Sequence, residues 1–167
     1  MEKMWSPWRS QYIQSFKDKK GDEECIFCGI ETIEVNDDNN LVVYKNENCF
    51  IVLNLYPYNS GHLLIVPFRH LSNFYELTDE ENLEVMKLLG RSMEVLDKTM
   101  RPHGYNMGAN LGKSAGAGID AHIHFHIVPR WNGDTNFMPA IGEVKVISQD
   151  LLQTKHELIK EFKNISM

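Results

Sequence analysis

Three histidines alternate with apolar residues in the segment 122–126, whose sequence is His-Ile-His-Phe-His. On a β-strand alternate residues share a face, so His122, His124 and His126 would form one row with about 7 Å per step. On a helix the same spacing would scatter them around the axis, and the interleaved apolar residues favour a strand with a buried rear face. A neutral imidazole can act as a nucleophile near neutral pH, because its ordinary pKa is about 6.5.

The loop that precedes this row is rich in glycine, with Gly112, Gly116 and Gly118 around Lys113 and Ser114. Such a loop can turn its backbone N–H groups inward and cradle an anion. A nucleophilic base beside an anion cradle indicates phosphoryl or nucleotidyl transfer.

Other interpretations of the histidine row stay open at this point. A tri-histidine zinc centre has the right ligands, although side chains about 7 Å apart along a strand do not easily converge on one ion. A non-catalytic nucleotide-binding module would bind its ligand without forming a covalent intermediate. A set of plain buried histidines is the least favoured interpretation, because a fourth histidine stands at Gly61-His62.

A second candidate site is the pair Cys25 and Cys28, which two residues separate. One tight turn can bring two such thiolates to a single zinc ion, and zinc would need two further ligands. His70 and His122 are the candidates for them. The alternatives are a redox pair and two reduced core thiols with His70 at the surface; no βαβ pattern surrounds the motif to favour thioredoxin-like chemistry.

Composition limits the class of protein. The chain has 167 residues, 43% of them hydrophobic, which is enough for one domain with a buried core. The net charge is −6 and no long basic run occurs, which argues against a nucleic acid polymer as the partner. We expect neither a signal peptide nor a membrane span. Three cysteines without a disulfide framework favour a cytoplasmic location.

Short strands with turns between them dominate the first part of the chain. The turn-forming segments include the polar residues 36–40 and the hairpin connection 46–48. Mostly antiparallel strands with helices on one side indicate the α+β class. Strands are expected at 41–45, 49–54, 62–67, 105–111 and 126–130, the last as the end of the histidine strand.

Two helices are predicted. Thr78 and Glu81 form a capping box at the start of the first, and Arg101-Pro102 ends it. The second is expected to open at Ser148. The apolar residues at helical spacing, including the methionines, are expected in the core: Val85, Met86, Leu89, Met93, Leu96 and Met100 in the first helix, and Leu151, Leu152, Leu158, Ile159 and Phe162 in the second.

We expect residues 1–167 to form a single domain that includes two terminal segments. Residues 1–24 are predicted to dock on the domain through an aromatic cluster, which could instead line the ligand site or a subunit interface. Arg9 in this segment could reach a phosphate. Residues 138–167 are the C-terminal tail and helix. The aromatic cluster contains Met4, Trp5, Pro7, Trp8 and Tyr12.

The histidine row carries a family resemblance. His122-Ile-His-Phe-His-Ile-Val resembles the histidine triad (HIT) motif His-φ-His-φ-His-φ-φ, where φ is apolar. Upstream, the segment from Asn54 through Gly61-His62 to Pro67 resembles the Asn…Pro…Gly-His…Pro block of that family. The segments 128–137 and 5–13 are similar to the branch of diadenosine tetraphosphate phosphorylases and hydrolases. The resemblance covers nearly the whole chain.

The resemblance implies a HIT-like fold with about five antiparallel strands and two main helices, and a homodimer or larger homo-oligomer in which half-sheets join. It implies an enzyme that cleaves dinucleoside polyphosphates through a covalent nucleotidyl-histidine intermediate, by phosphorolysis or hydrolysis. A purine nucleoside phosphoramidase of the same family is the alternative. The ligand expected is thus a nucleotide.

The resemblance also implies individual roles. His124 is the nucleophile, and the carbonyl of His122 holds its other ring nitrogen. His126 binds the phosphoryl oxygens and the leaving group, as a hydrogen-bond donor or general acid, and His62 supports the row. Asn54 would bind ribose hydroxyls. The phosphate contacts fall to Asn110, Ser114, Gly116, Ala117 and Gly118, together with His126.

For metals, the resemblance implies a structural zinc ion bound by Cys25, Cys28, His70 and His122. It implies no organic cofactor and allows magnesium bound with the nucleotide. One position departs from the family pattern: many relatives carry Gln or Ser four residues before the triad, where this chain has Gly118. Backbone amides, Ser114 or Lys113 would have to replace that side chain.

Overall fold

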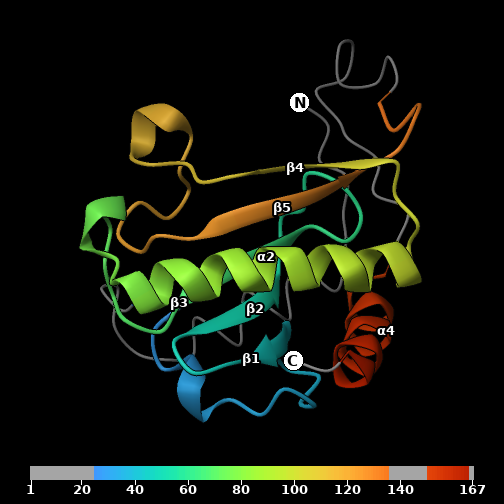
Figure 1. Cartoon of the computed structure of the whole chain (residues 1–167), viewed down its shortest axis with the longest axis horizontal. Coiled ribbons are helices and arrows are strands. Elements are labelled where there is room, and N and C mark those ends of the chain that lie inside the picture. The colour runs from blue at the N-terminus through green and yellow to red at the C-terminus, as the bar shows by residue number, and fades with distance from the viewer. Residues whose placement is uncertain (1–24, 136–149, 166–167) are drawn as a thin grey trace, which may run out of the picture.

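The described part of the chain folds into a five-stranded antiparallel sheet with two helices, as the sequence predicts (Figure 1). The computed structural model describes residues 25–135 and 150–165. The strands pair in the order β1-β2-β3-β5-β4. The strands are β1 (Val42–Lys45), β2 (Cys49–Leu53), β3 (Leu63–Pro67), β4 (Gly104–Gly108) and β5 (Phe125–Arg130); the helices are α2 (Asp79–Thr99) and α4 (Leu151–Asn164); three 3-10 turns are η1 (Ile30–Thr32), η2 (Phe74–Glu76) and η3 (Lys113–Ala115).

The register of the central strands determines which side chains share each face of the sheet. Val52 pairs with Leu64 and Leu64 pairs with His126, so these three side chains share one face. Ile51 and Ile65 pair on the opposite face. Both faces are buried, which is why β2 and β3 are apolar throughout rather than alternating.

Helix α2 covers the face opposite to His126. It packs against β2, β3 and β5, and it crosses the sheet in Figure 1. Tyr105 shows which face the helix covers. It lies on the same face of the sheet as Ile127, opposite to His126, and its hydroxyl donates a hydrogen bond to the Met93 carbonyl of α2 at 3.2 Å. The histidine face is therefore left for a cavity.

A bulge in β1 lets this edge strand serve both faces. Val42 pairs with Val52, but Tyr44 already pairs with Ile51, so one extra residue stands between them. Val42 consequently points to the histidine face and Tyr44 to the helix face. The Tyr44 ring stacks on Phe162 of α4, with centroids 5.3 Å apart and planes at 20°. This contact helps to seat α4 against β1.

Helix α2 begins as predicted. The Glu81 amide donates to Thr78 Oγ1 at 3.2 Å, and the Thr78 amide donates to Glu81 Oε2 at 2.8 Å, which completes the capping box. The methionine prediction was wrong at Met86, whose side chain is 60% exposed. The buried stripe runs one residue away from it, through Val85, Leu88, Leu89, Ser92, Val95 and Leu96.

Two further expectations need correction at α4. The helix is capped by Asp150, whose carboxylate accepts from the Gln153 amide at 2.9 Å, and not by Ser148. Leu152 is 39% exposed, whereas Leu158, Ile159 and Phe162 are buried as expected. Ser148 itself, the N-terminal segment 1–24 with Arg9, and the segment 136–149 lie outside the described residues.

The histidine row does not lie wholly on a strand. β5 begins at Phe125, so His122 and His124 precede it and only His126 is in the strand. The preceding segment follows the chain after β3 instead: the Ile123 amide donates to the Leu71 carbonyl at 2.7 Å. The expectation that one strand carries all three histidines is therefore corrected, because only His126 belongs to β5.

Gly61 lies in the turn that ends the connection between β2 and β3 and precedes His62. Its φ of +71° is in the left-handed region, which L side chains rarely adopt. A Cβ at this position would also lie 2.5 Å from Met100 Sδ and 3.2 Å from Leu96 Cδ2. The backbone conformation thus requires glycine here, and a larger residue would in addition displace the side chain of Met100.

Gly61→Ala should lower the free energy of unfolding by about 2 kcal/mol or more, because strain and overpacking act together. Urea unfolding measures the change. Gly90→Ala is the matched control, since Gly90 lies in α2 with nothing within 4 Å of a built Cβ. The control should be neutral or up to about 1 kcal/mol more stable, as alanine favours a helix. Equal effects of the two substitutions would contradict the argument.

Candidate active site and metal centre

A cavity of about 520 Å³ lies on the histidine face of the sheet, within the size range of small-molecule sites. Its walls are mostly apolar; polar residues line the end near β5, and Asn40 is a further polar lining residue at the β1 end. The apolar walls include Phe27, Ile30, Leu41, Val42, Phe50, Val52 and Leu64, and the polar or glycine end includes Asn54, Tyr58, Asn110, Gly116, Gly118, His124 and His126. The arrangement suits a ligand with one anionic end and one flat apolar end.

His124 has a defined tautomer. Its Nδ1–H donates to the His122 carbonyl at 2.9 Å, so the proton is on Nδ1 and the lone pair is on Nε2. The ring is 6% exposed, and this burial lowers its pKa, with the hydrogen bond to the carbonyl opposing the shift. A neutral imidazole with a fixed lone pair beside the cavity is the geometry that a nucleophile needs.

A hydrogen-bonded relay orients the other two imidazoles. The Tyr58 amide donates to His62 Nδ1 at 3.0 Å, so His62 carries its proton on Nε2. That Nε2 lies 2.9 Å from His126 Nδ1 and must donate to it, which places the proton of His126 on its own Nε2. His126 Nε2 is buried and has no hydrogen-bond partner within residues 25–135 and 150–165.

The electrostatics of His126 agree with this assignment. Burial and the neighbouring His124 lower its pKa to about 4. A second proton on Nδ1 would also face the N–H of His62. In the resting site His126 is therefore a neutral hydrogen-bond donor, and the donor role that the sequence predicts fits better than a resting general acid.

The side chain of Asn54 makes hydrogen bonds within its own loop. Its Oδ1 accepts from the Tyr56 amide at 2.9 Å, and its Nδ2 lies 3.2 Å from His62 Nδ1. Asn54 thus joins Tyr58 in presenting donors to this ring, while it still lines the cavity. Contact with a ribose stays a prediction.

The glycine-rich loop meets the expectation only in part. Asn110, Gly116 and Gly118 line the cavity, whereas Ser114 and Ala117 are not among its lining residues. The amides of Gly116 and Ala117 donate to carbonyls within the loop, at 3.0 and 3.3 Å. These two amides are therefore not aimed at the cavity in this conformation, because the loop forms the short turn η3. The phosphate role of the loop stays a prediction.

Several residues that shape the site were not identified from sequence. The Tyr58 ring stacks on His126, with centroids 5.6 Å apart and planes at 14°. Its neighbour Asn59 donates to the Pro129 carbonyl at 3.0 Å and to Asp134 Oδ2 at 2.8 Å. Asp134 also accepts two bonds from Arg130, at 2.6 and 2.9 Å. This network ties the His62 loop to the end of β5.

The four predicted metal ligands do come together. One ligand atom from each residue lies within 4.8 Å of the others, although the residues are far apart in sequence: Cys25, Cys28, His70 and His122. His122 Nδ1 is 3.3 Å from Cys25 Sγ and 3.9 Å from Cys28 Sγ, and His70 Nδ1 is 3.3 Å from Cys28 Sγ. A tetrahedral zinc ion holds such atoms about 3.3–3.8 Å apart, so the donor set fits.

The orientation of His122 supports a ligand role. Its Nε2–H donates to the Pro67 carbonyl at 2.9 Å, which leaves the Nδ1 lone pair toward the two thiols. Phe27 lies between the cysteines in sequence and packs against the rings of both His122 and His124, at 5.6 and 5.3 Å. The metal centre and the candidate nucleophile are thus adjacent parts of one core.

Comparison with known proteins identifies the family. The HIT domain family model matches residues 36–133, and the chain belongs to the HIT family. It is 39% identical over 165 residues to the AP-4-A phosphorylase of Mycobacterium tuberculosis H37Rv, covering 97% of this chain and 85% of that protein. The family predicted from sequence is therefore confirmed.

Solved structures show the same fold. A hypothetical histidine triad nucleotide-binding protein from Sulfolobus tokodaii is 26% identical, with a TM-score of 0.65 over 84% of this chain and 93% of its own. A zinc-bound histidine triad family protein from Mycobacterium smegmatis is 23% identical, with a TM-score of 0.61 over 75% and 85%.

Stability should depend on pH through His126. Its pKa is about 4 in the folded chain and about 6.5 when unfolded, so unfolding takes up a proton between these values. The contribution is complete above pH 6.5 and is lost as the pH falls toward 4. Urea unfolding of the wild type and of His126→Gln measures it. The free energy of unfolding of the wild type, relative to that of His126→Gln, should fall by on the order of 1–3 kcal/mol as the pH is lowered from about 6.5 to about 4. A relative free energy that does not change over this interval would contradict the assignment.

Proposed function

We propose that this chain cleaves dinucleoside polyphosphates, with diadenosine tetraphosphate as the expected substrate and inorganic phosphate as the acceptor. The observation that carries the proposal is the fixed Nε2 lone pair of His124 at the cavity, beside the neutral N–H donor of His126. The 39% identity to an AP-4-A phosphorylase supports both the predicted enzyme class and the choice of acceptor.

The first step forms a bond between His124 Nε2 and the α-phosphorus, and the bond from that phosphorus to its bridging oxygen breaks. ATP leaves with the electron pair of the broken bond, while the Nδ1–H of His124 stays on the His122 carbonyl and steadies the cationic ring. His126 Nε2–H is assigned the role of donor to the oxygen on which charge develops. Its burial strengthens that interaction.

In the second step His124 becomes the leaving group. An oxygen of inorganic phosphate attacks the phosphorus of AMP-His124, the nitrogen–phosphorus bond breaks, and ADP leaves. Both steps are displacements at the same phosphorus, so one set of fixed donors serves each of them. Water in place of phosphate would give AMP.

The nucleoside is assigned to the apolar part of the cavity. His126 is on β5 and Val42 is on β1, three strands away, so the cavity extends about 14 Å from one to the other. This length accommodates a ribose and base beyond a phosphate at His124. Phe27, Leu41 and Val42 offer apolar surface to the base.

Cys25, Cys28, His70 and His122 are assigned to a zinc ion with a structural role. The fit of the donor atoms supports this assignment, and so does the zinc-bound relative from M. smegmatis. When bound, the ion would tie the first described turn to the segment before β5. It takes no part in the steps above, in which only His124 and His126 act on phosphorus.

The remaining assignments concern the setting of the enzyme. No helix in residues 25–135 or 150–165 is long and apolar enough to cross a membrane, and a cytoplasmic location is proposed. Strand β4 is an outer strand whose middle and end are exposed, which favours a homodimer that joins two sheets there. Magnesium is expected only with the nucleotide, and no organic cofactor is expected.

Purified protein should contain about one equivalent of zinc per chain, and Cys25→Ser should lose most of it because a thiolate ligand is removed. Metal analysis by mass spectrometry measures both. His124→Ala is the control and should keep its zinc, since His124 is not a ligand. Release of zinc from His124→Ala would contradict both the metal assignment and the role of His124 as nucleophile.

Turnover of diadenosine tetraphosphate should yield ATP and ADP, and only when inorganic phosphate is present. Chromatography of the products, with and without phosphate, decides the acceptor. ATP and AMP in both conditions would identify a hydrolase instead. If neither condition gives turnover, the substrate proposal fails, and adenosine phosphoramidates become the compounds to test.

His124→Ala is the control for the chemistry. It should lose at least about a thousandfold in kcat, because the covalent route is removed. Radiolabelled AMP should be trapped on the wild type after an acid quench and not on this variant. Labelling of His124→Ala, or binding of nucleotide by the wild type without any labelling, would contradict the covalent mechanism.

A further inference from the structure

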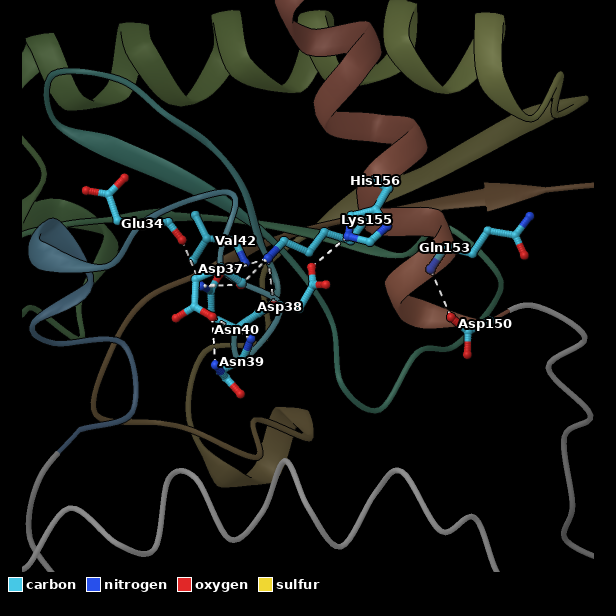
Figure 2. Close-up of polar contacts among 10 residues, drawn as sticks. All are labelled: Glu34, Asp37, Asp38, Asn39, Asn40, Val42, Asp150, Gln153, Lys155 and His156. Carbon is cyan, nitrogen blue, oxygen red and sulfur yellow. Dashed lines mark hydrogen bonds and ion pairs between the residues drawn. The ribbon is translucent and has the colours of Figure 1, made fainter.

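A buried lysine connects helix α4 to the loop before β1. Lys155 is 0% exposed, and Figure 2 shows its side chain reaching from the helix into the loop 37–40. Its Nζ donates to the Asp37 carbonyl at 2.6 Å and to the Asn40 carbonyl at 2.9 Å, with Asn40 Oδ1 at 3.4 Å. Three oxygens thus surround the ammonium group.

The loop that receives Lys155 is itself closely hydrogen-bonded. Asn40 Nδ2 donates to the Glu34 and Asp37 carbonyls at 2.9 and 2.8 Å, and the Val42 amide donates to Asn40 Oδ1 at 2.9 Å. These contacts are drawn in Figure 2. Asn40 is therefore held on both ends of its side chain and, with Lys155, at its carbonyl.

The same loop ends in a wall of the cavity. Asn40, Leu41 and Val42 are consecutive lining residues, at the β1 end to which the nucleoside is assigned. Their backbone therefore forms part of the wall at this end. A displacement of the Asn40 carbonyl toward or away from α4 would change the space available to a base.

Burying a charged ammonium group at this contact is energetically unfavourable. Burial lowers the pKa of Lys155, and Asp37 and Asp38 only partly offset the effect. An apolar side chain could pack α4 against β1 without that cost, as Phe162 does against Tyr44. What an apolar side chain cannot do is bind two carbonyls and fix where they lie. Helix α4 also lies outside residues 36–133, to which the family model extends.

We propose that Lys155 is a positioning residue, which shapes the nucleoside end of the cavity by fixing the backbone of residues 37–40 from helix α4. The inference rests on the proposed function, because it takes the occupant of this end to be the nucleoside of a bound nucleotide. Lys155 touches neither substrate nor reacting atoms. Its effect is on binding and not on the chemistry at His124.

Lys155→Met tests this role against Lys160→Met, which removes an exposed ammonium from the same helix. Calorimetry gives the Kd for AMP, and steady-state kinetics give kcat and KM for diadenosine tetraphosphate, well below the Tm of each variant. Lys155→Met should bind AMP about tenfold more weakly or worse and raise KM similarly, with kcat within about twofold of wild type. Lys160→Met should match the wild type in all three.

A purely structural lysine would give a different result. It would lower the Tm of Lys155→Met and leave the AMP affinity of the folded protein unchanged, and this outcome overturns the proposal. Lys155→Gln is the second variant should the first fail to fold, because an amide can still donate to one carbonyl. Amide exchange of the wild type needs no variant: AMP should slow exchange at residues 37–42, and an unchanged rate there overturns the proposal.

The two proposals can fail separately. A wild type that binds AMP but does not cleave diadenosine tetraphosphate refutes the proposed function, and the comparison of AMP affinities still decides the role of Lys155. Normal turnover with equal affinities in Lys155→Met and the wild type refutes the role of Lys155 alone. A wild type with neither measurable AMP binding nor turnover of diadenosine tetraphosphate refutes both.

Discussion

The hydrogen bond from His124 Nδ1 to the His122 carbonyl is the contact on which the site depends. It decides which ring nitrogen faces the cavity, and it requires the backbone of His122 to be fixed. That backbone is held because the imidazole of His122 is buried, bonded to the Pro67 carbonyl and placed against two cysteines. One residue therefore belongs to the candidate metal centre through its side chain and to the catalytic row through its main chain.

The two faces of the sheet have different roles, one packed against a helix and the other lining the candidate active site. Helix α2 covers one face of β2, β3 and β5, and the cavity occupies the other face of the same strands. Because β2 and β3 are buried on both sides, a shift of register would move apolar residues between two cores and expose none of them. Fixed connections such as the Gly61 turn are then needed to hold the register and to deliver His62 to the correct side.

Local patterns in the sequence predicted local features well. The capping box at Thr78 and the five short strands follow from spacing and turn residues. The histidine spacing predicted that His124 and His126 share a site, but it could not show that β5 begins only at Phe125. The exposed Met86 was misplaced because helical spacing alone leaves the edge of a stripe uncertain by one residue.

Contacts between distant segments carry no such local signal. Asn59 and Asp134 are 75 residues apart, and Lys155 and Asp37 are 118 apart. A lysine in an amphipathic helix is ordinarily predicted at the surface, so neither its burial nor its acceptors could be read from the pattern. The four metal ligands were found because cysteine and histidine are few and family resemblance aligned them, whereas the amide pairing within the glycine-rich loop needed coordinates.

Main-chain groups take part in fixing the proton positions of two of the histidines: the Tyr58 amide acts on His62, together with the side chain of Asn54, and the His122 carbonyl acts on His124. Every residue type except proline supplies that amide, and every residue supplies that carbonyl. The direction of proton donation is therefore protected from most substitutions at position 58, including those that abolish the aromatic stacking. Substitutions at position 58 can therefore alter the affinity of the site for ligands while the proton positions on His62 and His124 stay the same.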